Sequence, residues 1–168
     1  MWQARVHGDW NGRYYVYALQ FDGTEGEVLS ADPYARACGI NGRRSMVIDL
    51  ASAAPEGWDR DRRPEIPAHA RCICETHVGD FSADPAGGVP EEWRGKYLGF
   101  TADSTCLDDD PEKPTCLAYL KKLGVSHVQL MPIFDFDRTD EADPNAYNWG
   151  YDPLNYNVPE GSYATDPY

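Results

Sequence analysis

Residues 115–134 read TCLAYLKKLGVSHVQLMPIF, and this stretch decides the fold class of the second half of the chain. Its first ten residues predict a helix, with Thr115 after Pro114 as a candidate N-cap and Gly124 placed to end the helix in a left-handed conformation. The apolar stripe of that helix consists of Cys116, Leu120 and Leu123. Residues 125–134 are almost continuously apolar, as expected of a parallel strand that is covered on both faces.

Upstream of this helix the sequence predicts the strand that completes the unit. Residues 70–78, ARCICETHV, read as a short strand, and residues 79–113 form a long loop with several Gly, Pro and Asp. A strand, a helix and an apolar strand in that order indicate a βαβ unit.

The first fifty residues have a different composition and a different spacing of turn-forming residues. Residues 13–21, RYYVYALQF, are dense in aromatic and β-branched residues and follow the turn Asn11-Gly12. Further turns at Asp32-Pro33 and Asn41-Gly42 divide the remainder into short segments. Three or four short strands without helices suggest part of a β-sandwich.

Between these regions, the stretch ASAAPEGWDRDRRPEIP mixes Pro, Gly, charged and small residues and reads as an inter-domain connection. The expected division is therefore residues 1–52 for the β-sandwich part, 53–68 for the linker and 69–168 for the α/β part.

Composition excludes several classes of partner. Fifteen Lys and Arg against 28 Asp and Glu give a formal net charge of −13, which argues against a nucleic-acid or anionic-membrane partner. A neutral ligand such as a sugar remains compatible, because stacking and hydrogen bonds bind it. No apolar stretch is long enough to span a bilayer, and no signal peptide is visible, which favours a cytoplasmic location without deciding it.

The five cysteines include no C-x-x-C pair, so they do not indicate a metal site. Cys72 and Cys74 would share one face of a strand, and we interpret them as small core residues rather than a redox pair. Cysteine usage thus points to a mainly reducing compartment.

Residues 147–153, YNWGYDP, raise a functional question, since so many aromatic residues stand among turn formers. The run is too broken for a helix and too rich in turn formers for a long strand. Two readings are open: the rings pin a long loop by packing, or they bind a flat ligand.

Five stretches, in order along the chain, resemble the type I pullulanases, the α-glucan debranching group of glycoside hydrolase family 13. They are NGRYYVY, DPYARACGINGRRSMVIDL, CETHVGDFS, YLKKLGVSHVQLMPIFDF and YNWGYDPLNYNVPEGSYATDP. The resemblance implies an α/β fold with a β-rich N-terminal part. This would be the end of a starch-binding-like β-sandwich, followed by the first βαβ unit of an incomplete (β/α)₈ TIM barrel.

The resemblance also implies a retaining hydrolysis of α-1,6 branch links in pullulan, glycogen or starch, with an α-glucan as the partner. The family's catalytic carboxylates lie on barrel strands four, five and seven, whereas this sequence reaches Tyr168 before strand three. We therefore expect no catalytic residue within these 168 residues and no activity from them alone. Gly79 stands where pullulanases have Arg, so an isoamylase-like, branching or trehalose-releasing relative is the alternative within the class.

By the same resemblance, the aromatic loop would bind substrate. Tyr151 would be the platform under the glucosyl unit whose bond is cut, and Trp149 could pack beneath it. Asp152 and Asn148 would fix the loop or meet sugar hydroxyls, and Gly150 would allow a tight turn. The expected substrate-binding set is Tyr151, Asp152, Asn148, Trp149 and Tyr147.

Other candidates for chemistry have weaker support. By the family pattern, Glu75, Asp80, Asp135 and Asp137 support the barrel mouth and are not a catalytic pair. We interpret His77 as a core-facing or hydrogen-bonded strand residue. The acidic run between 135 and 143 lacks the Gly and closing Glu of an EF-hand, so a solvated loop is favoured over a Ca²⁺ site and no cofactor is expected.

A rival hypothesis belongs to another class. The chain could be a non-catalytic glucan-binding segment or a truncated remnant, because the aromatic loop and the β-sandwich resemblance need no catalytic group. No Ser-His-Asp motif, phosphate-binding Gly-rich loop or H-E-x-x-H pattern supports a further enzyme class.

Overall fold

The structure is a computed structural model that describes residues 3–167. Its strands are β1 (Tyr14–Tyr15), β2 (Tyr17–Leu19), β3 (Val28–Ser30), β4 (Ser45–Met46), β5 (Ile73–Thr76), β6 (His127–Leu130), β7 (Phe134–Phe136) and β8 (Pro153–Pro159). The α-helices are α1 (Val78–Phe81) and α2 (Cys116–Leu123). Short 3₁₀ turns are η1 (Ile40–Gly42), η2 (Trp58–Arg60), η3 (Ala68–Ala70), η4 (Pro85–Gly87), η5 (Glu91–Trp93), η6 (Tyr97–Thr101), η7 (Leu107–Asp109) and η8 (Gly161–Tyr163).

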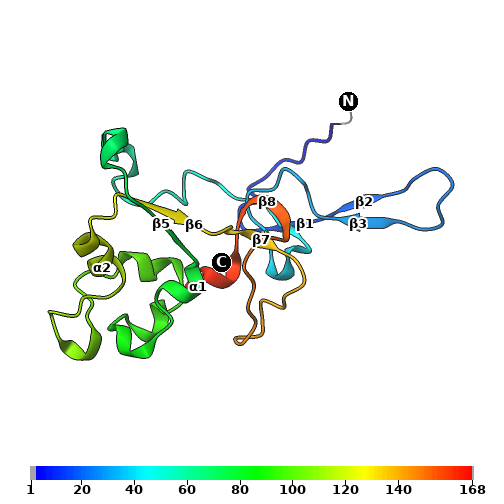
Figure 1. Ribbon diagram of the computed structural model, residues 1–168. Coiled ribbons are helices and arrows are strands. Elements are labelled where there is room, and N and C mark those ends of the chain that lie inside the picture. Colours follow the sequence, from blue (N-terminus) through cyan, green and yellow to red (C-terminus); the bar gives the residue numbers. More distant parts are fainter. Residues whose placement is uncertain (1–2, 168) are drawn as a thin grey trace.

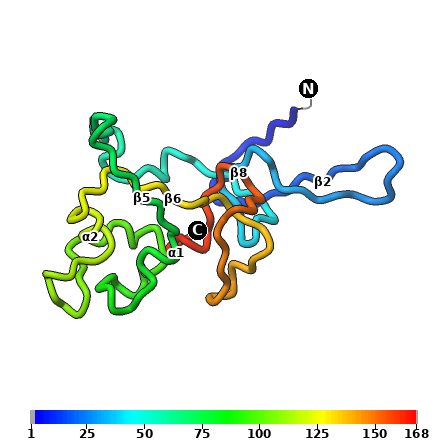
Figure 2. The backbone as a smooth tube through the Cα atoms, viewed as in Figure 1, coloured from blue at the N-terminus to red at the C-terminus, as the bar shows by residue number. Residues whose placement is uncertain are grey.

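The elements are arranged along an extended molecule (Figure 1). The β2–β3 hairpin projects from one end, α2 lies toward the other, and β7 and β8 lie between them. In Figure 2 the segment between β7 and β8, in orange, extends away from the strands as a long loop. Over residues 3–167, no helix has both the length and the apolar character needed to cross a membrane.

The N-terminal part is β-rich, as the sequence predicted, and is built from two-stranded antiparallel ladders. β1 pairs with β4, and β2 pairs with β3 so that Ala18 lies opposite Leu29. The Asn41-Gly42 turn also forms as predicted: both residues have positive φ, 57° and 61°, and the strands they join meet at the Cys38–Ser45 bridge.

The β2–β3 hairpin exposes apolar side chains on a pair of strands that nothing covers. Its large exposed side chains are Tyr17, Leu19, Phe21, Val28 and Leu29. This hairpin lacks the second layer that a sandwich would supply. An isolated two-stranded hairpin is only marginally stable in water.

The predicted strand–helix–strand order is present. β5 pairs with β6 in parallel, with Ile73 opposite His127, and α2 lies in the connection between them. Gly124 ends α2 at φ 75°, as the sequence indicated, and Lys121 and Lys122 lie in its last turn, where positive charge is favoured.

Two expectations for this unit were wrong in detail, and a third was confirmed in part. β6 is exposed along its whole length, because no described element covers either face. Leu120 is buried but Leu123 is 55% exposed, so the apolar stripe of α2 is shorter than predicted. Thr115 occupies the N-cap position, yet its hydroxyl donates to the Gly87 carbonyl oxygen at 2.5 Å rather than capping the helix.

The cysteines also depart from expectation. All five are free thiols. Cys72 is exposed, however, and Cys74 is only partly buried, because β5 pairs with β6 alone and its faces stay open. The interpretation of both as core residues was therefore wrong.

The antiparallel pair of β7 and β8 was not predicted. Phe136 lies opposite Pro153 and Asp135 opposite Asn155, with a register shift on each side of Asp135. Proline at each end of β8 and two asparagines within it hid this strand in the sequence, since those residues usually mark turns.

The main hydrophobic cluster lies where β7, α1 and η8 meet. Val78, Phe136 and Tyr163 form its buried centre, and Tyr97 and Phe100 pack around it. Phe100 also stacks on Phe81 with 3.9 Å between the ring centroids. Segments about sixty residues apart in sequence are thereby held together.

The η1 turn connects the N-terminal ladders to this centre. The Asn155 Nδ2 atom donates to the Gly42 carbonyl oxygen at 3.0 Å. Asn41 and Glu141 bond reciprocally, since each backbone N–H donates to the other's side-chain oxygen. A Cβ atom added at Gly42 would lie 2.4 Å from Asp135 Oδ2, so only glycine fits.

Gly42→Ala is expected to destabilise the protein more than Gly12→Ala. Both glycines have positive φ, but the Gly12 side-chain position is open and the Gly42 position is filled. The difference in free energy of unfolding, measured by urea denaturation, should be about 1–3 kcal/mol. Equal losses in the two variants would contradict the close approach of η1 to Asp135.

Candidate functional site

The aromatic loop predicted from the sequence is an exposed surface and not a packed one. Tyr147, Trp149 and Tyr151 are 55%, 61% and 63% exposed, and Tyr156 on β8 is 60% exposed. Such exposure contradicts the reading in which these rings pin the loop by burial. The packing of Trp149 beneath Tyr151 stays a prediction.

Polar contacts hold the loop instead. The Asn148 Nδ2 atom donates to the Asp137 carbonyl oxygen at 3.0 Å and to Thr139 Oγ1 at 2.8 Å. The Gly150 N–H returns a bond to Asn148 Oδ1 at 2.7 Å. The Asn148 side chain thus fixes the loop, one of the two uses expected of it.

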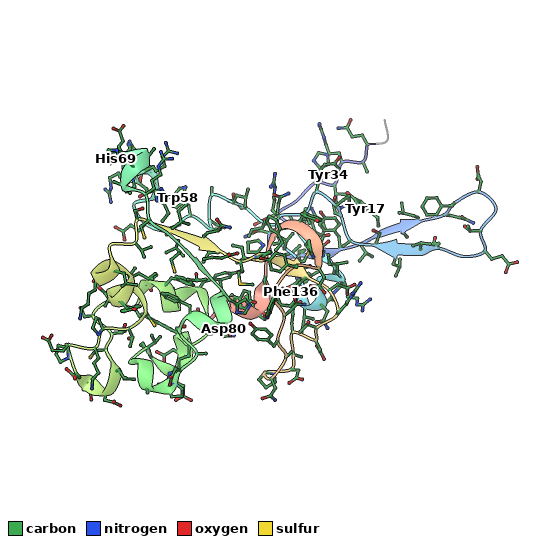
Figure 3. The ribbon with its side chains drawn as sticks, viewed as in Figure 1. Tyr17, Tyr34, Trp58, His69, Asp80 and Phe136 are labelled. Atoms are coloured by element: carbon green, nitrogen blue, oxygen red, sulfur yellow. The ribbon has the colours of Figure 1, made fainter. Side chains whose placement is uncertain are left out.

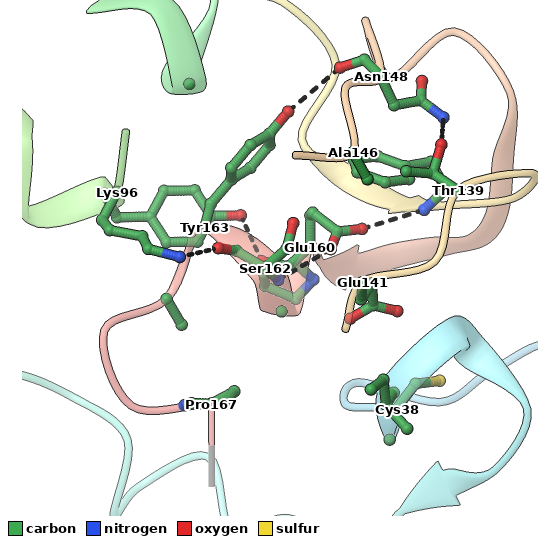
Figure 4. Close-up of a pocket in the computed structure, with 18 of the residues that line it drawn as sticks. Cys38, Lys96, Thr139, Glu141, Ala146, Asn148, Glu160, Ser162, Tyr163 and Pro167 are labelled. Carbon is green, nitrogen blue, oxygen red and sulfur yellow. Dashed lines mark hydrogen bonds between the residues drawn. The ribbon is translucent and has the colours of Figure 1, made fainter. Parts of the chain in front are cut away.

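A second contact joins the loop to the end of β5. His77 Nε2 lies 2.9 Å from the Asn148 carbonyl oxygen, and the Tyr163 hydroxyl lies 2.9 Å from the same nitrogen. The Tyr163 hydroxyl also donates to the Asn148 carbonyl oxygen at 3.3 Å, a bond visible in Figure 4. His77 is therefore hydrogen-bonded at the strand end, in agreement with the sequence interpretation.

The neighbouring residue is held from the same direction. The Tyr147 hydroxyl donates to Asp80 Oδ2 at 2.8 Å, and the Tyr147 ring lies 5.0 Å from the His77 ring, centroid to centroid. Partial desolvation and the Asp80 carboxylate raise the pKa of Tyr147. The Tyr147 ring is thus exposed, and its contacts with Asp80 and His77 fix its orientation.

The third contact is steric. Gly150 is buried at φ 82°, and an added Cβ atom would lie 2.2 Å from the Pro132 carbonyl oxygen. The tight turn expected at Gly150 is therefore also a close approach of two backbone segments.

Asp152 contributes to the loop through its backbone. Its carbonyl oxygen accepts from the Asp137 N–H at 3.0 Å, which closes the loop where β8 begins. Its carboxylate is partly exposed. The structure therefore brings Tyr147, Asn148, Trp149, Tyr151 and Asp152 onto one anchored loop.

Behind this loop lies a cavity of about 910 Å³ between the N-terminal ladders and the C-terminal segment (Figure 4). Cys38, Tyr97, Glu141, Tyr147 and Glu160 are among the residues that line it. Trp149 and Tyr151 do not line the cavity, so the exposed rings and the cavity are separate features.

Among residues 3–167, one group of acidic side chains is close enough together to hold a cation. One carboxylate oxygen from each of Asp135, Glu141 and Glu160 lies within 4.8 Å of the others. The protein's own donors already reach all three carboxyls, because Asn155 Nδ2 bonds Asp135, Asn41 N bonds Glu141, and Ser162 N bonds Glu160. These donors account for the cluster without a metal.

This cluster corrects the interpretation of the acidic run as a solvated loop. Asp135 is 2% exposed and Glu141 is half-buried, whereas Asp137, Asp140 and Asp143 are exposed as expected. Burial raises the pKa of Asp135 to about 6, and burial with the neighbouring Glu160 carboxyl raises the pKa of Glu141 to about 7. Periodicity gave no signal for this, since the partner Glu160 comes directly after β8, a strand that was not predicted.

Raised pKa values often mark catalytic groups, but access argues otherwise here. Asp135 is 2% exposed and does not line the cavity, and the Glu160 carboxyl, which does, is held by the Ser162 and Phe136 backbone N–H groups. The exposed aromatic loop therefore remains the candidate binding site.

Comparison with known proteins identifies the class. No model of a known protein family matches the chain. The pullulanase of Bacillus subtilis (strain 168) is 36% identical over 169 residues, which cover 100% of this chain and 22% of that protein. The solved pullulanase from Bacillus acidopullulyticus superposes with a TM-score of 0.86 at 44% identity, covering 96% of this chain and 19% of that one.

A pullulanase from Paenibacillus barengoltzii, solved in complex with maltohexaose and alpha-cyclodextrin, superposes with a TM-score of 0.87 at 43% identity over 96% of this chain and 25% of that one. The chain is therefore related to glycoside hydrolases. More narrowly, it is homologous to one segment of the pullulanases, and it spans about a fifth of the length of the curated relatives it matches.

Gly150→Ala should disrupt the loop, because the new methyl group would overlap the Pro132 carbonyl oxygen. We expect the free energy of unfolding to fall by about 1–3 kcal/mol more than in Gly124→Ala, measured by urea denaturation. Gly124 is the matched control, since its φ is also positive and nothing lies within 4 Å of the added atom. A Gly150→Ala variant no less stable than this control would refute the close approach.

The carboxyl cluster predicts a pH-dependent stability. Asp135 and Glu141 have folded-state pKa values above their ordinary ones, so their contribution is complete below about pH 4 and is lost as pH rises through about 6 to 7. Glu141→Gln imitates the protonated acid and should flatten the fall in thermal midpoint between pH 5 and 7 by about 2–4 °C.

The control for this measurement is Glu25→Gln, in the exposed loop of the β2–β3 hairpin. It should follow the wild-type curve throughout. A Glu141→Gln protein with the unaltered pH slope would show that the cluster does not titrate in this range.

Proposed function

We propose that this protein is a pullulanase-type debranching enzyme that hydrolyses α-1,6 links in a branched α-glucan. The observation that carries the proposal is homology along the whole chain, at 36% identity to a pullulanase, together with superposition on solved pullulanases. The exposed rings of the anchored aromatic loop supply the physical means to bind sugar.

The reaction we propose is a retaining hydrolysis. It requires two carboxyl groups about 5 Å apart on either side of the scissile bond, one ionised and one protonated. Among residues 3–167, Asp135, Glu141 and Glu160 form one close group of three carboxyls, whereas the family pattern places the catalytic pair on later barrel strands. We therefore assign the catalytic carboxyls to polypeptide outside these 168 residues.

The proposed organisation follows the resemblance. Residues 1–52 would belong to a β-sandwich, 53–68 to a linker and 69–168 to the beginning of a TIM barrel of glycoside hydrolase family 13. Two features support this: the parallel β5–β6 pair connected through α2, and the exposure of β6, which further barrel strands and helices would cover.

Within this scheme the aromatic loop forms part of the substrate groove. Sugar rings present weakly polar faces, so the exposed Tyr151 ring can shed water against one while polar neighbours meet its hydroxyls. Asp152, whose carboxylate is partly exposed, is the nearest candidate for a hydroxyl contact. Trp149 and Tyr147 would extend the surface on either side of Asn148.

A second candidate is a non-catalytic glucan-binding protein. It is favoured by one observation: the aromatic rings of the loop are exposed, and binding a sugar through them needs no catalytic group. The two candidates differ in turnover and not in binding. Release of maltotriose from pullulan by a protein that carries these 168 residues together with the proposed catalytic segment decides between them.

Tyr151→Ala should weaken binding to amylopectin about tenfold, because the loss of a stacking platform costs on the order of 1 kcal/mol or more. Affinity gel electrophoresis measures the change as reduced retardation. Tyr34→Ala is the control: Tyr34 is 87% exposed and lies on the N-terminal part, away from Asp80 (Figure 3). Equal retardation of the Tyr151→Ala and wild-type proteins would exclude the platform role.

A further inference from the structure

The aromatic loop is held from one side by two residues of the β5–α1 junction. His77 contacts the Asn148 carbonyl oxygen, and Asp80 accepts the Tyr147 hydroxyl. Both contacts bridge about seventy residues of sequence and act on adjacent loop positions. The inference below rests on the proposed function for its ligand, and on these contacts for its geometry.

Hydrogen bonding fixes the tautomer of His77. The Asp80 backbone N–H donates to His77 Nδ1 at 3.2 Å, so Nδ1 is the unprotonated nitrogen. Nε2 then carries the proton and can donate to the Asn148 carbonyl oxygen, which can only accept. The two nitrogens thus serve two different elements, with Nδ1 capping α1 and Nε2 holding the loop.

Tyr163 completes the arrangement. Its hydroxyl donates to the Asn148 carbonyl oxygen at 3.3 Å while lying 2.9 Å from His77 Nε2, so both lone pairs of that oxygen are used. His77 and Tyr163 are each only 7% exposed. In this buried setting the loss of one donor would leave the carbonyl oxygen short of a partner, which favours displacement of the loop.

We propose that His77, supported by Tyr163, is a positioning residue for glucan binding: it holds the Asn148 carbonyl so that the Trp149 and Tyr151 rings face solvent as a binding surface. His77 itself does not reach a ligand on that surface, because it is buried while the rings are 61% and 63% exposed. Its effect is transmitted through one backbone oxygen.

Gly79 gives the imidazole its space. A Cβ atom at residue 79 would lie 3.0 Å from His77 Cε1 and 3.3 Å from Nδ1, tighter than ordinary contact. The glycine that departs from the pullulanase pattern therefore adjoins the ring that holds the loop. This proximity ties Gly79 to the same positioning function.

Two substitutions separate the two roles of His77. His77→Gln places an amide N–H near the Nε2 position and keeps the donor to Asn148, whereas His77→Asn places a carbonyl oxygen near the Nδ1 position and keeps only the α1 cap. We expect His77→Asn to weaken amylopectin retardation at least tenfold and His77→Gln to stay within about threefold of wild type. Tyr163→Phe, which removes one donor, should fall between them.

A readout without ligand separates this inference from the proposed function. In hydrogen–deuterium exchange, the peptide covering residues 146–152 should exchange at least tenfold faster in His77→Asn than in wild type, and at a near wild-type rate in His77→Gln. Residues 116–123 of α2 serve as the internal reference and should be unchanged in both.

The outcomes are distinct. If wild-type protein is not retarded by amylopectin, the proposed function fails, while the exchange rates still decide whether His77 positions the loop. If the loop exchanges equally in His77→Asn and wild type, the positioning role is refuted. It is equally refuted if His77→Gln and His77→Asn lose binding to the same extent, because His77 would then act through packing alone.

Discussion

The buried carboxyl of Glu160 is the contact on which the centre of the structure depends. Its side chain accepts from the Ser162 N–H at 2.8 Å and from the Phe136 N–H at 3.3 Å, so it ties η8 to β7. Its backbone N–H donates to the Ile133 carbonyl oxygen, and its own carbonyl oxygen accepts from the Tyr97 hydroxyl. One fully buried residue thereby joins β7, β8, η6 and η8. Loss of its hydrogen-bond donors would leave a buried carboxyl without partners, which costs stability.

This arrangement makes the acidic cluster a consequence of topology. Glu160 lies beside β7, where its side chain accepts from the Phe136 N–H. Asp135 belongs to β7, and Glu141 reaches the same point from the loop that follows β7. The Asn41 and Asn155 donors relieve part of the repulsion, and burial raises the pKa of Asp135 and of Glu141. The same asparagines attach the η1 turn, so the docking of the N-terminal ladders and the protonation of the cluster depend on one another.

Sequence reasoning was most successful where local chemistry decides the backbone. The Asn41-Gly42 turn, the end of α2 at Gly124 and the parallel order of β5 and β6 all follow from short-range preferences. The strand β8 was missed because its prolines and asparagines usually form turns, and only its pairing with β7 makes it a strand. The burial of Asp135 could not be read from its acidic neighbours for the same reason, since Glu160 is twenty-five residues away in sequence.

The aromatic loop shows how a binding surface can be rigid and exposed at once. Burying its rings would order the loop but remove the surface that a sugar needs. A mobile loop would instead lose conformational entropy each time a sugar bound, which weakens binding. The structure avoids both costs by anchoring the backbone and the polar atoms: the Asn148 carbonyl on His77, the Asn148 side chain on Thr139, and Gly150 against Pro132. The aromatic side chains between these anchors then stay in solvent, and the alternation of anchored and exposed positions explains why asparagine and glycine are interleaved with tryptophan and tyrosine.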